Sequence, residues 1–350
     1  MDATPSIDTS TARAAEAPVG AARRRRRHPA SAPALVLAFA RHLTGHLDAE
    51  PLRRIADSAR PEDFWEALES FTDSITGSEW RRISRELHWV REVNREMERL
   101  QDRSPWRRAL AARHIGLLAV PGTRAPLRRV MAKGPGLVTL TAALALARRR
   151  DGPALQWLLA NPRATATRGR QQLVALILRF GPTAAEHLLR WIDEIPQESA
   201  IFFAAVEAIG ALGEERARPP LETLLRGGPL EARVAAARSL GRLASPVSVP
   251  ALMLALEDPA WQVQAQVASA LGRIGDPIAV PELAARAADP SWWVRRNAAY
   301  ALARHGAEGR ATLEKLAATS PDRYAAEMAV EVHDALAVDD EGIEEALGAD

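Results

Sequence analysis

Apolar residues recur along most of the chain at the spacing of a helix that buries one face. In the three segments that begin at Ile201, Val263 and Val294, apolar residues stand at offsets of 0, 4, 7 and 8. This spacing places their side chains on the same side of an α-helix. Each of these segments therefore predicts a helix with one buried face.

One apolar position of this helix recurs about every 31 residues. We call these positions the first ladder: Ile115, Leu146, Ile177, Ile209, Leu240, Leu271 and Leu302. In four repeats a glycine follows directly: Gly116, Gly210, Gly241 and Gly272. A second ladder keeps the same register: Leu127, Leu158, Leu189, Leu221, Leu252 and Leu283. Both ladders drift by one residue at the same repeat, so we predict stacked two-helix hairpins.

The turns between the predicted helices carry residues that end one helix and start the next. In Gly275-Asp276-Pro277, the glycine suits the left-handed position after a helix and the proline suits the start of the following one. Asp258-Pro259 and Asp289-Pro290 separate one hairpin from the next, and each aspartate is placed to cap a helix N-terminus. These motifs mark the expected helix ends.

We predict an all-α protein, a right-handed α-solenoid of about seven two-helix repeats of period 31 with an N-terminal helical cap. The expected parts are a disordered basic tail (1–33), the cap region (34–104), the repeat solenoid (105–320), a C-terminal capping helix (321–338) and an acidic tail (339–350). Within the cap we expect one helix from Pro61 and one long helix from Ser78, whose apolar stripe runs from Trp80 to Met97.

Composition agrees with this fold and excludes some chemistry. The chain contains no cysteine, which excludes disulfides, iron–sulfur clusters and cysteine zinc sites. Lys133 and Lys315 are its two lysines, and the dominance of arginine and alanine indicates a GC-rich bacterial genome. The apolar run from Ala32 to Ala40 is shorter than the roughly 20 residues that span a bilayer. We therefore predict no transmembrane span.

Charge is segregated along the chain although the net charge is +2. The net charges of successive segments are +3 (1–33), −3 (34–99), +13 (100–180) and −11 (181–350). In the basic segment two turns have lost the Gly-Asp-Pro motif: Val120-Pro121-Gly122 and Arg150-Asp151-Gly152. Asymmetry of this kind bears on binding partners rather than on the fold.

The most regular repeats share a recognisable motif. Its copies read SLGRLASPVSVPALMLALEDP, ALGRIGDPIAVPELAARAADP and WWVRRNAAYALARHG. They resemble the HEAT-like repeats of the phycobilisome-lyase (E/Z-type) class, closely over residues 196–320 and more weakly over 105–195. The resemblance implies a bacterial HEAT-repeat protein, in a family that contains both scaffolds and enzymes. The last copy, followed by DRYAAEMA, is also similar to bacterial HEAT-repeat proteins with an N-terminal membrane helix.

No catalytic constellation is evident in the sequence. The deoxyhypusine hydroxylases of this family hold two irons through repeated His-Glu dipeptides, and the chain contains no such dipeptide. His42 and His46 are spaced to share a helix face, but no third metal ligand accompanies them. His305 occupies a position that is apolar in other repeats, and His114 one that is small. We expect no catalytic residue, no metal and no cofactor.

Two groups of residues are candidates for binding. Trp261 and Trp292 stand 31 residues apart at the start of successive helices, with Trp293 and Arg296 beside the second. Large aromatics at such turns either bind a partner or pack on the neighbouring repeat. The second group belongs to the basic segment: Arg128, Arg129, Arg148, Arg149 and Arg150. Arginines in successive repeats can follow a phosphate backbone or meet an acidic partner.

We favour a non-catalytic scaffold that binds a protein partner through the concave face of the solenoid. One alternative is a HEAT array that binds nucleic acid through the basic block of residues 103–179. A second is a lyase-type accessory protein of the phycobilisome-lyase class. For the run Arg23–Arg27 the alternatives are a solvated tail, a contact with an anionic membrane surface or nucleic acid, and the flank of a membrane anchor. We expect a cytoplasmic protein, either free or peripheral to the inner membrane.

Overall fold

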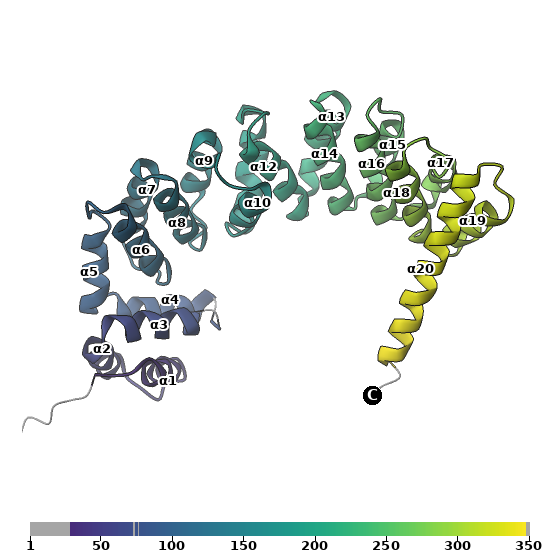
Figure 1. The fold of residues 1–350 in the computed structure, drawn as a ribbon. Coiled ribbons are helices and arrows are strands. Elements are labelled where there is room, and N and C mark those ends of the chain that lie inside the picture. Colours follow the sequence, from purple (N-terminus) through teal and green to yellow (C-terminus); the bar gives the residue numbers. More distant parts are fainter. Residues whose placement is uncertain (1–28, 73, 76, 348–350) are drawn as a thin grey trace, which may run out of the picture.

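Helices are the regular elements of this protein throughout the part that its structure, a computed structural model, describes. The structure describes residues 29–347 except 73 and 76, so the run Arg23–Arg27 and the last three residues lie outside it. Within that range the chain forms twenty α-helices joined by turns, some of which contain a short 3₁₀ segment. The helices follow one another along an arch (Figure 1). The prediction of an all-α solenoid is confirmed.

Seven hairpins build the arch. The inner helices are α6 (Pro105–Gly116), α8 (Gly136–Ala147), α10 (Arg170–Leu178), α12 (Ala200–Ala211), α14 (Leu230–Leu243), α16 (Trp261–Ile274) and α18 (Trp292–Ala303). The outer helices are α7 (Arg124–Lys133), α9 (Gly152–Ala160), α11 (Thr183–Trp191), α13 (Arg218–Gly227), α15 (Val249–Ala255), α17 (Val280–Arg286) and α19 (Gly306–Thr319). In Figure 1, α7, α9, α13 and α15 lie along the outer edge of the arch, and α6, α8, α14, α16 and α18 lie along its inner edge.

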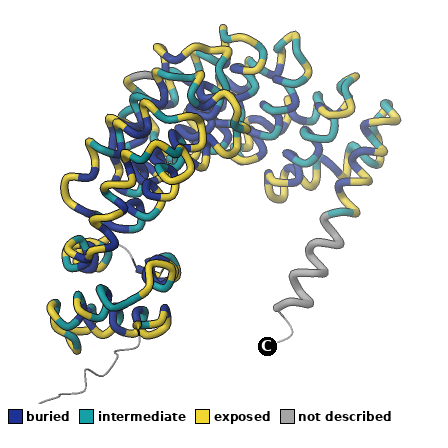
Figure 2. Tube along the Cα trace, turned by 60° about the vertical axis from the view of Figure 1, so that its left-hand side comes forward, coloured by how far each residue is buried: buried dark blue, intermediate teal, exposed yellow. Residues whose placement is uncertain are grey.

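The two leucine-rich ladders form the core between these layers, which Figure 2 shows as a continuous run of buried residues along the arch. Every first-ladder residue is fully or almost fully buried. In the second ladder one prediction is wrong, because Leu188 occupies the core of α11 and Leu189 is only half-buried. The buried stripe of that helix runs through Ala184, Leu188 and Ile192, which centres it one residue earlier than in the neighbouring repeats.

Successive inner helices touch at the glycines that follow the first ladder. A Cβ added to Gly241 would lie 2.8 Å from Ala270 of α16, and one added to Gly272 would lie 2.7 Å from the backbone of Ala301 in α18. Gly116 and Gly210 make the same approach to α8 and α14. These glycines are present because the inner helices are too close for a side chain.

The N-terminal cap consists of α1 (Ala32–Leu43), α2 (Ala49–Ser58), α3 (Pro61–Thr72), α4 (Gly77–Leu87) and α5 (Arg91–Arg99). The single long helix expected from Ser78 is wrong, since the chain turns between α4 and α5, where Val90 is extended. The break allows α4 to pack on α1 and α2 while α5 packs on α6. One straight helix would leave half of that apolar stripe without a neighbour.

Hydrogen bonds and a ring stack join the cap to the first repeat. The Trp80 indole N–H donates to the carbonyl oxygen of Leu117 at 2.7 Å. The Trp65 ring stacks on His114 with centroids 4.3 Å apart, and His114 Nδ1 lies 3.3 Å from the buried carboxylate of Glu96. Burial alone would raise the pKa of Glu96, but His114 and Arg99 hold it below its usual value. The cap is therefore continuous with the solenoid.

At the other end of the arch, α20 (Arg323–Leu347) follows the last hairpin (Figure 1). It runs past residue 338, after which we expected the acidic tail, and the chain has no proline in this range to end it. No helix in the described ranges combines the length and the apolar character needed to cross a bilayer.

The inner-helix contact predicts opposite effects for two Gly→Ala changes. Gly272→Ala should lower the free energy of unfolding by about 1–3 kcal/mol, because its methyl group overpacks against α18. Gly227→Ala, on outer helix α13 with open space around it, should be neutral or stabilise by up to about 1 kcal/mol through helix propensity. Urea denaturation measures both, and an equal response of the two variants would contradict the packing argument.

Candidate binding surfaces

One side of every inner helix points away from the outer helices. Each residue turns an α-helix by about 100°. Four positions of each inner helix therefore lie opposite the buried first-ladder residue. Three of them come nine, five and two residues before it in the sequence, and the fourth comes two residues after it. Most residues at these positions are exposed or half-buried. We call the surface that they form the concave face. Residues about 31 apart in the sequence are neighbours on it.

Arginine occupies the position two after the first ladder in five of the seven repeats. We call these residues the arginine row: Arg148, Arg179, Arg242, Arg273 and Arg304. Leu117 and Ala211 take the position in the other two repeats. The row has the same period as the ladders, so the sequence contains this signal. Of its five members, Arg148 alone was among the candidates chosen from the sequence.

Acidic residues are nearly absent from the inner helices, which contain only Glu207 and Glu231. Glu207 is fully buried, and its carboxylate lies 3.2 Å from Arg170, 3.0 Å from Arg238 and 3.7 Å from Arg242. The acids that make the C-terminal half negative are therefore on the outer helices, in the turns and in α20. The concave face remains basic in both halves of the solenoid.

Apolar side chains are exposed on the concave face at its N-terminal end. They are Trp106 and Leu110 on α6, and Leu137 and Leu144 on α8. A hollow of about 570 Å³ lies between these two helices, and Leu144 and Arg148 are part of its lining. Exposed apolar residues beside arginines make this end of the face suitable for a partner that offers both apolar and acidic groups.

The predicted tryptophans lie at the other end. Trp261, Trp292 and Trp293 are 43%, 43% and 52% exposed. The rings of Trp292 and Trp293 meet edge to face at 4.7 Å, and the Arg296 guanidinium lies 5.7 Å from the Trp292 centroid and 4.6 Å from that of Tyr300. The structure joins Trp292, Trp293 and Arg296 in one cluster, while Trp261 begins the preceding inner helix. Partial exposure of the rings is compatible with packing and with binding.

Arg128 of the basic segment has a role inside the fold. Its guanidinium donates two hydrogen bonds of 2.7 Å to the carboxylate of Asp151. Asp151 is buried and also accepts the amide hydrogen of Ala154 in the first turn of α9. This pair links two outer helices. Arg129, the next residue, is exposed on α7.

Arg149 is buried and is also part of the fold. It donates hydrogen bonds to three carbonyl oxygens: Ala145 at 2.7 Å, Ile115 at 2.6 Å and Leu118. Its burial, together with the charges of Arg124 and Arg148, lowers its pKa to about 10. Arg149 remains cationic at neutral pH, and it brings a positive charge into the interior.

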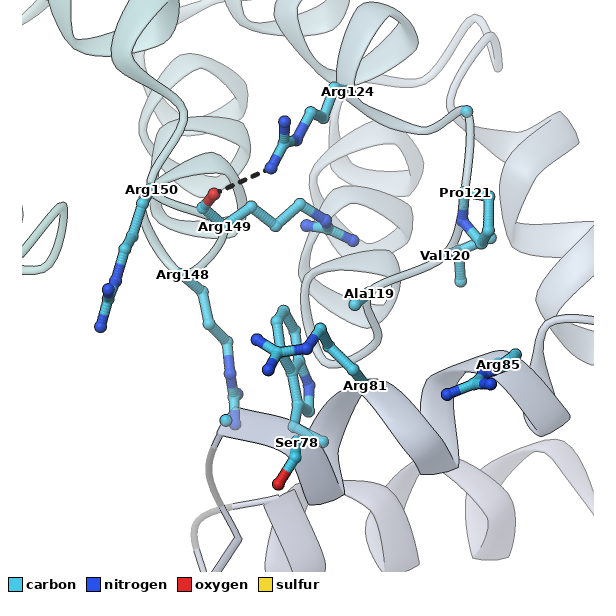
Figure 3. A pocket seen from close by; sticks show the side chains of 13 residues that line it. Ser78, Arg81, Arg85, Ala119, Val120, Pro121, Arg124, Arg148, Arg149 and Arg150 are labelled. Atoms are coloured by element: carbon cyan, nitrogen blue, oxygen red, sulfur yellow. Dashed lines mark hydrogen bonds between the residues drawn. The ribbon is translucent and has the colours of Figure 1, made fainter. Parts of the chain in front are cut away.

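Arg148, Arg149 and Arg150 meet residues of the cap around one pocket (Figure 3). The pocket has a volume of about 920 Å³ and lies between α4, the α6–α7 turn and the α8–α9 turn. Six arginines line it: Arg81, Arg85, Arg124, Arg148, Arg149 and Arg150. No acidic residue is among the described residues of its lining. We call it the arginine pocket.

The histidines considered in the sequence take structural positions. His42 is buried, with Nδ1 2.8 Å from the carbonyl oxygen of Leu47. Helix α1 ends before His46, so the two histidines do not share a helix face. His305 is buried, with Nδ1 2.7 Å from the carbonyl oxygen of Ala301. In the part of the chain that the structure describes, no group of three or more His, Asp or Glu is arranged to hold a metal ion.

Comparisons with known proteins agree with the repeat pattern. A family model for HEAT repeats matches residues 221–303 and 249–332, and one for the PBS lyase HEAT-like repeat matches 202–227. Human deoxyhypusine hydroxylase in complex with glycerol is similar at 20% identity, over 77% of this chain and 95% of that one, with a TM-score of 0.32. An engineered protein is similar at 21% identity, over 85% and 77% of the two chains, with a TM-score of 0.28. A comparison with curated proteins gave no match.

The structural role of Arg149 can be tested by substitution. Arg149→Met should lower the free energy of unfolding by at least about 2 kcal/mol, because it removes a charged donor from each of three buried carbonyl oxygens. Arg129→Met, which removes the same charge from an exposed position, should change it by less than about 0.5 kcal/mol. Thermal and urea unfolding measure both. Equal stability of the two variants would show that the buried hydrogen bonds of Arg149 do not hold the repeats together.

Proposed function

We propose that this HEAT-repeat protein of the PBS-lyase-like class is a non-catalytic scaffold that binds a protein partner on its concave face. The partner segment is extended and acidic, and it carries apolar side chains. The observation that supports this proposal is the arginine row, which supplies one cation in most repeats of a face with almost no acidic residues.

The spacing of the row suits an extended peptide. Packed helices lie about 8–10 Å apart, so arginines in consecutive repeats present their guanidinium groups at about that interval. An extended chain in the polyproline II conformation rises about 3.1 Å per residue and has three residues per turn, so every third side chain lies on the same side of the peptide and meets the next arginine. Carboxylates at that spacing can each form a charge-assisted hydrogen bond with the row.

Apolar residues on the same face favour a protein over a nucleic acid. Leu110, Leu137 and Leu144 are exposed between the arginines of the first repeats, and a phosphate backbone offers no apolar group to cover them. Two arginines of the basic block, Arg128 and Arg149, already have partners inside the fold. These features support a protein partner more than the alternative of a nucleic-acid-binding array.

We also propose a cellular location for this protein. A scaffold of this kind acts in the cytoplasm, where the run Arg23–Arg27 allows a peripheral contact with an anionic membrane surface. That run lies outside the described residues, so it is supported by its sequence alone.

Reversal of charge in the arginine row should weaken peptide binding. The probe is a fluorescent 15-residue peptide with glutamate at every third position and leucine between, and its binding is followed by anisotropy. The double variant Arg273→Glu/Arg304→Glu should weaken binding by at least about tenfold, or about 1.4 kcal/mol. Arg129→Glu/Arg226→Glu makes the same charge change at exposed positions of outer helices and should leave affinity within about twofold.

A duplex DNA of the same net charge serves as the competing probe. Absence of saturable peptide binding up to about 1 mM, the limit of a weak specific complex, would contradict the proposal. So would an equal loss of affinity in the two double variants. Tighter binding of the DNA than of the peptide, with a steep dependence on salt, would instead establish the nucleic-acid alternative.

A further inference from the structure

The arginine pocket shares Arg148 with the arginine row but lies between the cap and the first two repeats, and it has the features of a site for a small anion. Figure 3 shows Arg81, Arg124 and Arg149 converging from three elements, whereas the Arg150 side chain points away from them, toward Gly181. Arg81 and Arg85 come from α4 of the cap, Arg124 from the start of α7, and Arg148 to Arg150 from the end of α8. The pocket therefore exists only because the cap is docked on the first two repeats.

Several of these arginines are held in place by the protein itself. Arg148 donates to the carbonyl oxygen of Thr72 at 2.7 Å, and its guanidinium lies over the Trp80 ring at 5.4 Å. Arg124 donates to the carbonyl oxygen of Arg149 at 3.1 Å, which is the dashed contact in Figure 3. Side chains that are already ordered lose little entropy when a ligand binds. The pocket is thus preorganised.

Like charges lie close together in the pocket. The buried carboxylate of Asp151 lies 3.7 Å from Arg124, but both of its oxygens accept hydrogen bonds from Arg128. Desolvation and the like charges of Arg124 and Arg148 lower the pKa of Arg149. An anion in the pocket would relieve this repulsion.

Two helix N-termini add to the positive potential. Gly77 and Ser78 of α4 line the pocket, and so do Gly122 and Arg124 at the start of α7. The first turn of a helix presents unpaired backbone N–H groups and a partial positive charge, a combination that binds phosphate in many proteins. Here these termini add to a set of six arginines.

We infer that the arginine pocket binds a small ligand with a di- or triphosphate group. Arginine forks match the oxygen geometry of phosphate and form paired, charge-assisted hydrogen bonds with it. The volume of about 920 Å³ lies within the range of small-molecule sites, roughly 300–1,000 Å³, and admits a group larger than a single phosphate. Because the ligand contacts the cap and both adjacent repeats, it also stabilises their junction.

Calorimetric titration with inorganic pyrophosphate and, separately, with magnesium-free ATP tests this inference. In about 0.1 M salt, where the Debye length is about 10 Å, the wild-type chain should bind pyrophosphate and its unfolding midpoint should rise with ligand concentration. Sulfate at equal ionic strength should bind at least tenfold more weakly. Tighter binding of ATP than of pyrophosphate would identify a nucleoside polyphosphate as the ligand, and equal binding would identify the phosphate group alone.

Arg81→Gln/Arg85→Gln is the decisive variant, because both side chains are exposed on α4 and should not be needed for folding. It should lose pyrophosphate affinity by tenfold or more while its ligand-free unfolding midpoint stays unchanged. The control Arg129→Gln/Arg226→Gln removes two charges elsewhere and should bind like wild type. No binding to wild type, or equal losses in both variants, would overturn the inference. Binding of the acidic peptide should survive Arg81→Gln/Arg85→Gln, so this inference and the concave-face proposal fail separately.

Discussion

Close contact between successive inner helices determines the shape of this protein. Gly210, Gly241 and Gly272 each face the backbone of the next inner helix at a distance that leaves no room for a Cβ. The outer helices pack against each other much less closely. A stack whose two layers differ in spacing must curve toward the tighter layer. The concave face is therefore a direct consequence of small residues at one position per repeat.

Curvature also controls where charge is found. Side chains about 31 residues apart become neighbours on the inner layer, and this turns a periodic arginine into a row that Ala211 interrupts once. Glu207, the one fully buried acid of that layer, is surrounded by three arginines from neighbouring helices and so does not interrupt the basic surface. The other acids of the C-terminal half lie on the outer helices, in the turns and in α20, which explains how a segment of net charge −11 has a basic inner face.

The turns of the irregular N-terminal repeats differ in sequence from those of the regular repeats, and this difference contributes to the arginine pocket. Val120-Pro121-Gly122 and Arg150-Asp151-Gly152 replace the Gly-Asp-Pro turn of later repeats, and residues of both turns line the arginine pocket. Asp151 keeps its capping role in α9 while it also pairs with Arg128. The regular copies stabilise the array, whereas the irregular copies and the cap together form the arginine pocket.

The sequence by itself determined the repeat architecture, because the burial of one helix face imposes a period that leucine, glycine and Asp-Pro all follow. It also contained the arginine row, which a search at the same period would have found. Only the tertiary structure decided which arginines are available, since Arg128 and Arg149 look like Arg129 in sequence but end inside the fold. It likewise decided the break between α4 and α5 and the meeting of Arg81 and Arg85 with Arg148 to Arg150. Those outcomes depend on how the cap docks on the first repeats. Contacts between residues far apart in the chain produce no periodic pattern in the sequence, so they could not be predicted from it.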